Sequence, residues 1–195
     1  MKTIILGGFL GSGKTTVLLK LAKRMVSNAK EGKTPVVIIE NEIGDISVDT
    51  KMLGAYEVRE LFSGCVCCTL AGDLTANAKE IAEKYDPEYL IVEATGVAHP
   101  HNIVDVMEEY IDRKDLLCVV LADASRWSEL MEDMEVFVSN QLKGADCILL
   151  NKCDLVTDEE RDKLLEDLRY LNGEAKILPI SALGDKNEWL DEILR

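Results

Sequence analysis

The sequence predicts an α/β fold in which helices flank a doubly wound, mostly parallel sheet. Short apolar runs alternate along the chain with stretches of helical periodicity, which is the order expected of β-α-β units. Four consecutive β-branched residues, Val36 to Ile39, indicate a strand that is buried on both faces, as in a parallel sheet. Right-handed crossovers join such strands, and ligands bind beyond their carboxyl ends.

In the first half of the chain, an apolar run predicts a strand at 4–8, and an amphipathic stretch predicts a helix at 17–25. Gly32 and Pro35 interrupt the pattern before the next strand. Leucine, alanine and isoleucine recur at helical spacing before Tyr85. The remaining elements expected in this half are strands at 36–40, 57–62 and 89–93 and a helix at 73–85.

The second half continues the alternation without repeats, low-complexity tracts or linkers. We expect helices at 103–111, 128–141, 158–171 and 188–194, and strands at 116–123, 146–150 and 176–180. A length of 195 residues suits one domain with a substantial core, so we expect a single domain over 1–195.

The composition is that of an ordinary globular protein, with 47% hydrophobic and 30% charged residues. The net charge of −14 argues against nucleic-acid and anionic-membrane partners, which would repel an acidic surface. No apolar run approaches the ~20 residues that span a membrane. Residues 1–3 lead directly into a core strand, so we expect no signal peptide and a cytoplasmic protein.

A glycine-rich loop connects the first expected strand to the first helix. Its pattern is Gly8-x4-Gly13-Lys14-Thr15, and this strand–loop–helix context is what a phosphate cradle requires. Lys14 would meet the β- and γ-phosphates, and the Thr15 hydroxyl would bind Mg²⁺. The alternative is a glycine-rich turn without function. The residues expected to bind nucleotide here, in a P-loop NTPase, are Gly8, Gly11, Ser12, Gly13, Lys14, Thr15 and Thr16.

The segment Asn151-Lys152-Cys153-Asp154 follows the expected strand at 146–150 and indicates the base. A carboxylate at Asp154 can accept hydrogen bonds from guanine N1–H and its amino group, which adenine does not offer. Asn151 and the Lys152 stem would frame the base plane, and Ser181-Ala182 forms the other base-side loop. We therefore favour GTP over ATP.

Glu93-Ala94-Thr95-Gly96 occupies the position where Ras-like proteins carry Asp-x-x-Gly. The Glu93 carboxylate can hold Mg²⁺, and the Gly96 N–H can sense the γ-phosphate. We find no counterpart of the glutamine that orients water in Ras-like enzymes, so we expect slow hydrolysis of the β–γ phosphoanhydride. The expected catalytic residues are Lys14, Thr15 and Glu93.

Five of the six cysteines divide into two groups. Cys118 and Cys147 lie in apolar runs and are expected in the core, whereas Cys65, Cys67 and Cys68 crowd into a polar, glycine-flanked stretch. Thiolates combined with carboxylate or histidine suit Zn²⁺ and also accept Co²⁺ or Ni²⁺. A redox pair and buried thiols are the alternatives. Further ligands could come from Glu40, Glu42, Asp45, His99 or His101.

Together these motifs resemble the CobW-like metallochaperone GTPases, relatives of HypB and UreG. The resemblance extends over about residues 3–183 and rests on the P-loop, the Glu40-Asn41-Glu42-x-Gly44 segment, Gly64-Cys65-Val66-Cys67-Cys68, Glu93-x-Thr95-Gly96 and Asn151-Lys152-x-Asp154. Gly-Cys-x-Cys-Cys is the motif specific to this family.

The resemblance implies a transition-metal site at Glu40, Cys67 and Cys68, with Cys65 as a further ligand. It implies a protein that binds a metal, delivers it to a client apo-metalloprotein and uses GTP to control the transfer. Members of the family often dimerise, so a homodimer is an open alternative. CobW-like proteins usually carry a second, C-terminal domain and often a His-rich tract, so against this family we expect the present sequence to be a minimal or truncated member.

Two other functions stay open at this stage. One is a G-protein chaperone for a cobalamin-type cofactor enzyme, resembling MeaB, without a metal cargo of its own. The other is a small-molecule kinase, which conflicts with Asn151-Lys152-x-Asp154. His99, before Pro100, is either a surface histidine beside a turn or an additional ligand or proton-linked switch near the nucleotide.

Overall fold

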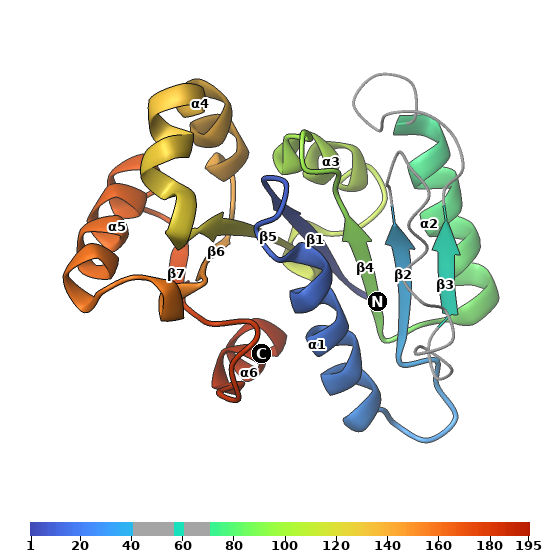
Figure 1. The fold of residues 1–195 in the computed structure, drawn as a ribbon. Coiled ribbons are helices and arrows are strands. Elements are labelled where there is room, and N and C mark those ends of the chain that lie inside the picture. The colour runs from blue at the N-terminus through green and yellow to red at the C-terminus, as the bar shows by residue number, and fades with distance from the viewer. Residues whose placement is uncertain (41–56, 61–70) are drawn as a thin grey trace.

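The structure is a computed structural model that describes residues 1–40, 57–60 and 71–195. Within these ranges, seven strands form one sheet in the order β3-β2-β4-β1-β5-β6-β7, and all neighbouring strands are parallel (Figure 1). The strands are β1 (Lys2–Gly8), β2 (Val36–Glu40), β3 (Glu57–Glu60), β4 (Tyr89–Glu93), β5 (Leu116–Asp123), β6 (Cys147–Asn151) and β7 (Lys176–Pro179).

In the described part of the chain, helices follow every strand except β2, whose connection to β3 lies outside the described residues. They are α1 (Lys14–Ser27), α2 (Ala71–Tyr85), α3 (Pro100–Met107), α4 (Trp127–Leu142), α5 (Asp158–Leu171) and α6 (Glu188–Leu194). Three 3₁₀ turns, η1 (Arg113–Asp115), η2 (Ala124–Arg126) and η3 (Cys153–Leu155), complete the described elements. Within the described part of the chain, no helix is long and apolar enough to cross a membrane.

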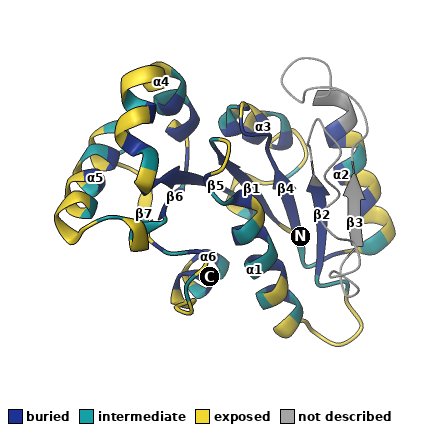
Figure 2. Cartoon of the chain, in the orientation of Figure 1, coloured by how far each residue is buried: buried dark blue, intermediate teal, exposed yellow. Residues whose placement is uncertain are grey.

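The sheet is the middle of three layers. One hydrophobic cluster joins one face of the sheet to α2, α3, α4 and α5, and a second joins the other face to α1 and α6. Side chains alternate between the two clusters along a strand: Ile5 belongs to the first, whereas Ile4 and Leu6 belong to the second. Both faces of the central strands are therefore buried, as Figure 2 shows.

The predicted α/β, doubly wound fold is confirmed, with strand and helix boundaries mostly within two residues of those expected. The helix expected at 103–111 is wrong at both ends, because α3 spans Pro100–Met107. Pro100 begins the helix, where its fixed φ and missing N–H cost nothing. After Met107 the chain turns, and the Tyr110 and Ile111 N–H groups both donate to the Met107 carbonyl. Residues 61 and 62, expected in the third strand, lie outside the described residues.

The strand order brings several candidate loops together. β1 pairs with β4 on one side and β5 on the other, so the loops that follow these three strands meet at one edge of the sheet. This is the carboxyl edge, where parallel α/β sheets bind ligands. β4 and β2 pair so that Glu93 and Glu40 are Cα partners in the register.

Candidate functional site

The loop between β1 and α1 turns tightly into the helix at Gly13. Gly13 is the N-cap of α1 and has a φ of 100°, in the left-handed region that favours glycine. A Cβ atom at this position would lie 2.4 Å from Asn151 Nδ2, so only glycine fits here. The loop is closed by a hydrogen bond from the Ser12 N–H to the Phe9 carbonyl, 3.1 Å long. The first turn of α1 is thus exposed to a ligand held in the loop.

Lys14 places a cation inside this loop. The residue is 7% exposed, and its Nζ donates to the carbonyl oxygens of Gly8 at 3.1 Å and Phe9 at 3.4 Å. Two buried hydroxyl oxygens, Ser12 Oγ in this loop and Thr95 Oγ1 in the loop after β4, have no hydrogen-bond partner among the described residues. Buried donors without partners are costly, and an anionic ligand would satisfy them. The residues present therefore fit a phosphate group.

Thr15 and Glu93 lie next to each other at the start of α1 and the end of β4. The Thr15 hydroxyl donates to Glu93 Oε1 across 3.4 Å, and Glu93 is 3% exposed. A hydroxyl and a carboxylate are the hard oxygen ligands that Mg²⁺ prefers. This pair fits a magnesium ion on the nucleotide.

Gly96 lies against the tip of the phosphate loop. A Cβ atom built on Gly96 would lie 2.6 Å from the Cγ and Cδ2 atoms of Leu10 and 2.9 Å from its backbone nitrogen. The loop after β4 can approach the phosphate loop this closely only because Gly96 lacks a side chain. Thr16 follows Thr15 on α1 and is half-buried.

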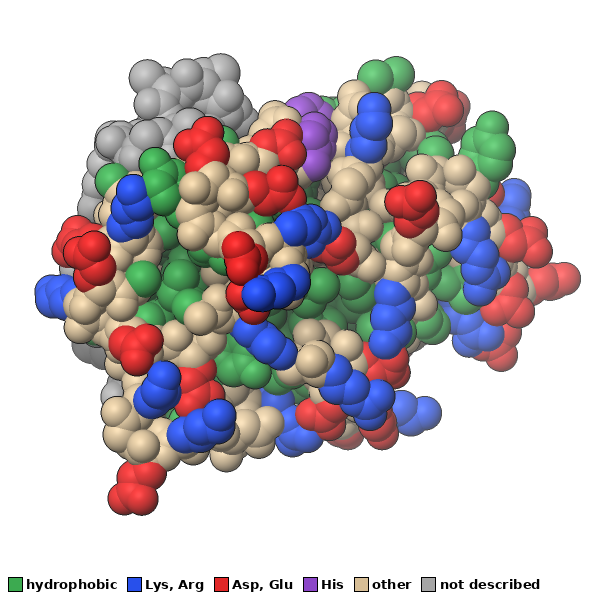
Figure 3. Space-filling model, turned by 180° about the vertical axis from the view of Figure 1, so that it is seen from behind, with side chains coloured by type: hydrophobic (Ala, Val, Ile, Leu, Met, Phe, Trp, Pro, Cys, Tyr) green, Lys and Arg blue, Asp and Glu red, His purple; other side chains and the backbone are tan. Residues whose placement is uncertain are grey.

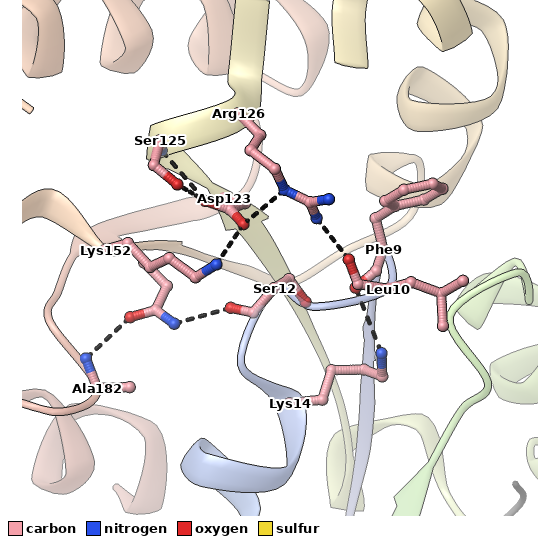
Figure 4. Close-up of polar contacts among 10 residues, drawn as sticks. Phe9, Leu10, Ser12, Lys14, Asp123, Ser125, Arg126, Lys152 and Ala182 are labelled. Atoms are coloured by element: carbon pink, nitrogen blue, oxygen red, sulfur yellow. Dashed lines mark hydrogen bonds and ion pairs between the residues drawn. The ribbon is translucent and has the colours of Figure 1, made fainter. Parts of the chain in front are cut away.

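Asn151, at the end of β6, joins the phosphate loop to the loop after β7. Its Nδ2 donates to the Ser12 carbonyl and its Oδ1 accepts from the Ala182 N–H, both at 2.8 Å (Figure 4). The residue is 3% exposed. Ser181 is half-buried beside it and Asp154 is exposed on η3. The residues expected on the base side are therefore brought together, and the Asp154 carboxylate is accessible to a ligand.

A charged cluster that the sequence did not predict lies on this side of the site. The Asp123 side chain is 0% exposed, and its Oδ2 lies 2.6 Å from Lys152 Nζ and 3.2 Å from Arg126 Nε. Arg126 also donates through Nη2 to the Leu10 carbonyl at 2.5 Å (Figure 4). The cluster thus fixes both the phosphate-loop tip and Lys152, whose φ of 65° is left-handed.

Hydrogen bonds set the ionisation of this carboxylate. Burial raises the pKa of Asp123, but hydrogen bonds from Lys152, Ser125 and Arg126 outweigh it and hold the pKa below the ordinary value. Asp123 is therefore ionised and pairs with both cations. The sequence did contain one signal for Asp123, its position at the carboxyl end of an expected strand. The other candidate site residues also lie at or after strand ends, where parallel sheets bind ligands.

His99 and His101 flank Pro100 at the start of α3. Their ring centroids are 5.8 Å apart, and the His99 ring lies 5.3 Å from that of Phe137. Histidine side chains reach the surface on the face seen in Figure 3, among interspersed acidic and basic groups. Among the residues that the structure describes, no group of three or more His, Cys, Asp or Glu side chains could hold a metal ion.

The metal-site prediction falls mainly outside the described residues. Glu42, Asp45, Cys65, Cys67 and Cys68 all belong to the ranges 41–56 and 61–70, and Glu40 is described only as the last residue of β2. Cys118 and Cys147 are 0% and 4% exposed, which confirms them as core residues. Cys153 is half-buried and its thiol donates to the Leu150 carbonyl at 3.1 Å.

Comparison with known proteins gives consistent matches. Residues 2–179 match the family model described as CobW/HypB/UreG, nucleotide-binding domain. The chain is 32% identical over 188 residues to the zinc chaperone YjiA of Escherichia coli, covering 91% of this chain and 56% of that protein. It is 30% identical over 217 residues to zinc-regulated GTPase metalloprotein activator 1 of Dictyostelium discoideum, covering 89% and 44%. The chain thus spans about half the length of these relatives.

Solved structures agree on the fold. HypB of Archaeoglobus fulgidus superposes with a TM-score of 0.69 at 19% identity, covering 100% of this chain and 89% of that one. The Zn(II)-bound YjiA GTPase of E. coli superposes with a TM-score of 0.65 at 25% identity, covering 96% and 59%. With the family model matching most of its length, the chain belongs to the CobW/HypB/UreG family and carries that family's nucleotide-binding domain.

Proposed function

We propose that the protein binds and slowly hydrolyses GTP, and that it carries a transition metal to a client metalloprotein under the control of the nucleotide. The observation that carries the nucleotide part is the convergence of Lys14, the Thr15–Glu93 pair and Asn151 on one loop. Lys14 and Thr15 begin α1, Glu93 ends β4 and Asn151 ends β6, and together they supply a cation, two oxygen ligands and a support for the base-side loops.

Lys14 would neutralise charge on the β- and γ-phosphates, and the N–H groups of residues 11–16 would donate to phosphate oxygens. Thr15 and Glu93 would hold Mg²⁺, which neutralises charge that develops on the phosphates during hydrolysis. Asp154 would select guanine, because its carboxylate can accept hydrogen bonds from guanine N1–H and the amino group, and adenine offers no such donors at that edge. Gly96 would sense the γ-phosphate through its N–H.

The relatives support the metal part of the proposal. YjiA is named a zinc chaperone and has been solved with Zn(II) bound. The chain contains the thiols for such a cargo, and thiolates bind Zn²⁺, Co²⁺ and Ni²⁺. We propose Cys65, Cys67, Cys68 and Glu40 as ligands. The cargo would be released to a client apo-metalloprotein.

The register of the sheet supports coupling between the two sites. Glu40 ends β2 and is the Cα partner of Glu93, which ends β4. Neighbouring strands of a parallel sheet lie about 4.8 Å apart and are joined by backbone hydrogen bonds. A shift of Glu93 on binding nucleotide and Mg²⁺ would therefore be felt at Glu40. This is the physical route by which GTP would control the metal.

The nucleotide proposal is tested by measuring the affinities for GTP, ATP and xanthosine triphosphate with fluorescent analogues. The wild-type chain should prefer GTP. The Asp154→Asn variant should lose GTP affinity and gain affinity for the xanthine nucleotide, because an amide N–H at this position meets the xanthine 2-carbonyl. Equal wild-type affinity for ATP and GTP would contradict the proposal.

The metal proposal is tested by competitive titration of the reduced protein with Zn²⁺, Co²⁺ and Ni²⁺. Tight one-to-one binding should be lost in a Cys67→Ala/Cys68→Ala variant. Cys153→Ala is the matched control, because Cys153 lies in η3 on the base side and should leave the affinity unchanged. Wild-type binding no tighter than micromolar would show that the chain carries no metal cargo.

A further inference from the structure

Gln141, near the carboxyl end of α4, is a buried amide directed at the loop of residues 94–99. The residue is 2% exposed. Its Nε2 donates to the carbonyl oxygens of Gly96 at 3.0 Å and Ala98 at 2.9 Å. Both partners are acceptors, so the NH₂ group, and not the amide oxygen, must face the loop. Two hydrogen bonds thus use both donors of one side chain.

These bonds act on the residue that lies against the phosphate loop. Gly96 approaches Leu10 so closely that a Cβ atom would lie 2.9 Å from the Leu10 nitrogen. Gln141 holds Gly96 through its carbonyl, and Leu10 is held in turn by Arg126, the N-cap of α4. The two ends of α4 therefore support the two backbone segments that meet at the phosphate loop.

From this arrangement we propose that Gln141 is a positioning residue that makes the site distinguish GTP from GDP. By fixing the carbonyls of Gly96 and Ala98, it orients the 94–99 loop so that the Gly96 N–H is ready for a γ-phosphate. Without Gln141 the loop must be ordered when the triphosphate binds, and that ordering reduces affinity. GDP has no γ-phosphate, so its affinity does not depend on this loop.

This inference rests on the proposed GTP binding, and it concerns a residue that would touch neither nucleotide nor metal. The test compares the affinities of the Gln141→Glu variant for a non-hydrolysable GTP analogue and for GDP, both with Mg²⁺. Glutamate has nearly the same shape but presents carboxylate oxygen to the two carbonyls. We expect the analogue to bind about tenfold more weakly, from two lost hydrogen bonds, and GDP to bind within about twofold of wild type.

The matched control is Asn172→Asp. The Asn172 Nδ2 donates to two carbonyls at the same end of α4, those of Leu142 at 2.8 Å and Ala145 at 3.2 Å, and its Oδ1 accepts from the N–H groups of Glu174 and Ala175. The exchange removes the same donors without touching the 94–99 loop. It should lower the melting temperature and leave the ratio of GTP-analogue to GDP affinity unchanged.

If Gln141→Glu does not fold, Gln141→Met keeps the length of the side chain without a charge, and the same ratio is measured. A folded Gln141 variant with a wild-type ratio would overturn the inference while the proposed function stands. An equal ratio change in Asn172→Asp would also overturn it, because the effect would then be one of general stability. Wild-type protein that binds neither nucleotide would overturn the proposed function and this inference together.

Discussion

Lys152 and Asp123 form an ion pair in which Nζ lies 2.6 Å from Oδ2. Asp123 ends β5 and Lys152 directly follows the neighbouring strand β6, so that Asp123 is the register partner of Asn151, the residue before Lys152. The Lys152 ammonium is therefore held towards β5 by a carboxylate that is completely buried. This pair connects the base-side loop to η2 and, through Arg126, to the phosphate loop.

The Asp123→Asn variant should be substantially less stable. It keeps the size of the side chain but leaves the two cations, Lys152 and Arg126, without a counter-charge. Because these cations are 30% and 37% exposed, we expect a loss of about 2 kcal/mol, less than for a fully buried pair. The loss in the free energy of unfolding is measured by urea denaturation of the variant and the wild type.

The control for this variant is Asp191→Asn. Asp191 pairs with Arg24 at 2.7 Å, with side chains 45% and 42% exposed, so removing its charge should cost less than about 1 kcal/mol. Equal losses at the two positions would show that the buried cluster has no special contribution.

The Asp123 pair also predicts how stability depends on acid. The pKa of Asp123 is lower in the folded protein than its ordinary value, so its contribution is fully present above the unfolded pKa of about 3.9. It is lost as the pH falls through the folded pKa. The difference in unfolding free energy between wild type and Asp123→Asn should therefore be constant from pH 7 to 5 and shrink below about pH 4. If the stability difference between wild type and Asp123→Asn instead increased at low pH, Asp123 would not be the ionised partner of Lys152 and Arg126.

Gly96→Ala should weaken binding of a GTP analogue. The added methyl group would meet the Leu10 nitrogen at 2.9 Å and force the 94–99 loop away from the phosphate loop. Overpacking of this kind costs about 1–3 kcal/mol, and we expect most of it to appear as lost affinity. In Gly173→Ala the nearest atom is 3.3 Å away, the Arg169 carbonyl oxygen, so this variant should bind normally. Normal binding by both variants would exclude a role for close contact at Gly96.

Cys118 and Cys147 should resist alkylation. Burial raises the pKa of Cys118 to about 12 and that of Cys147 to about 11, and the thiolate is the reactive form. In native protein at pH 8, iodoacetamide should leave both unmodified, as mass spectrometry of peptides would show, whereas both should react in urea. Rapid native modification of Cys118 would contradict its position in the core.

The sequence predicted the central strands well because they are apolar runs buried on both faces, such as Val36 to Ile39. It placed α3 wrongly because Pro100 looked like the end of a loop, although proline is equally suited to the first helical turn. Local sequence patterns therefore predict that an element exists, but not where it begins. The backbone contacts that decide between such alternatives are formed only in the folded chain.

The residues that the sequence missed have partners far away in the chain. Gln141 bonds to carbonyls 45 and 43 residues distant, and backbone carbonyls leave no pattern in a sequence. The sequence contains 36 acidic residues, and nothing local distinguishes Asp123 from the others. Its role becomes visible only when β5 pairs with β6 and brings Lys152 beside it. By contrast, the phosphate loop and Asn151-Lys152-x-Asp154 are contiguous motifs, so they could be recognised without the fold.

The most direct test of the account is the affinity of the reduced protein for Zn²⁺, measured with and without a non-hydrolysable GTP analogue and Mg²⁺. If Glu93 and Glu40 couple the two sites, the analogue should change the Zn²⁺ affinity by at least about fivefold, and Zn²⁺ should change the analogue's affinity by the same factor. A Zn²⁺ affinity that is identical with and without the analogue would show that the nucleotide does not control the metal.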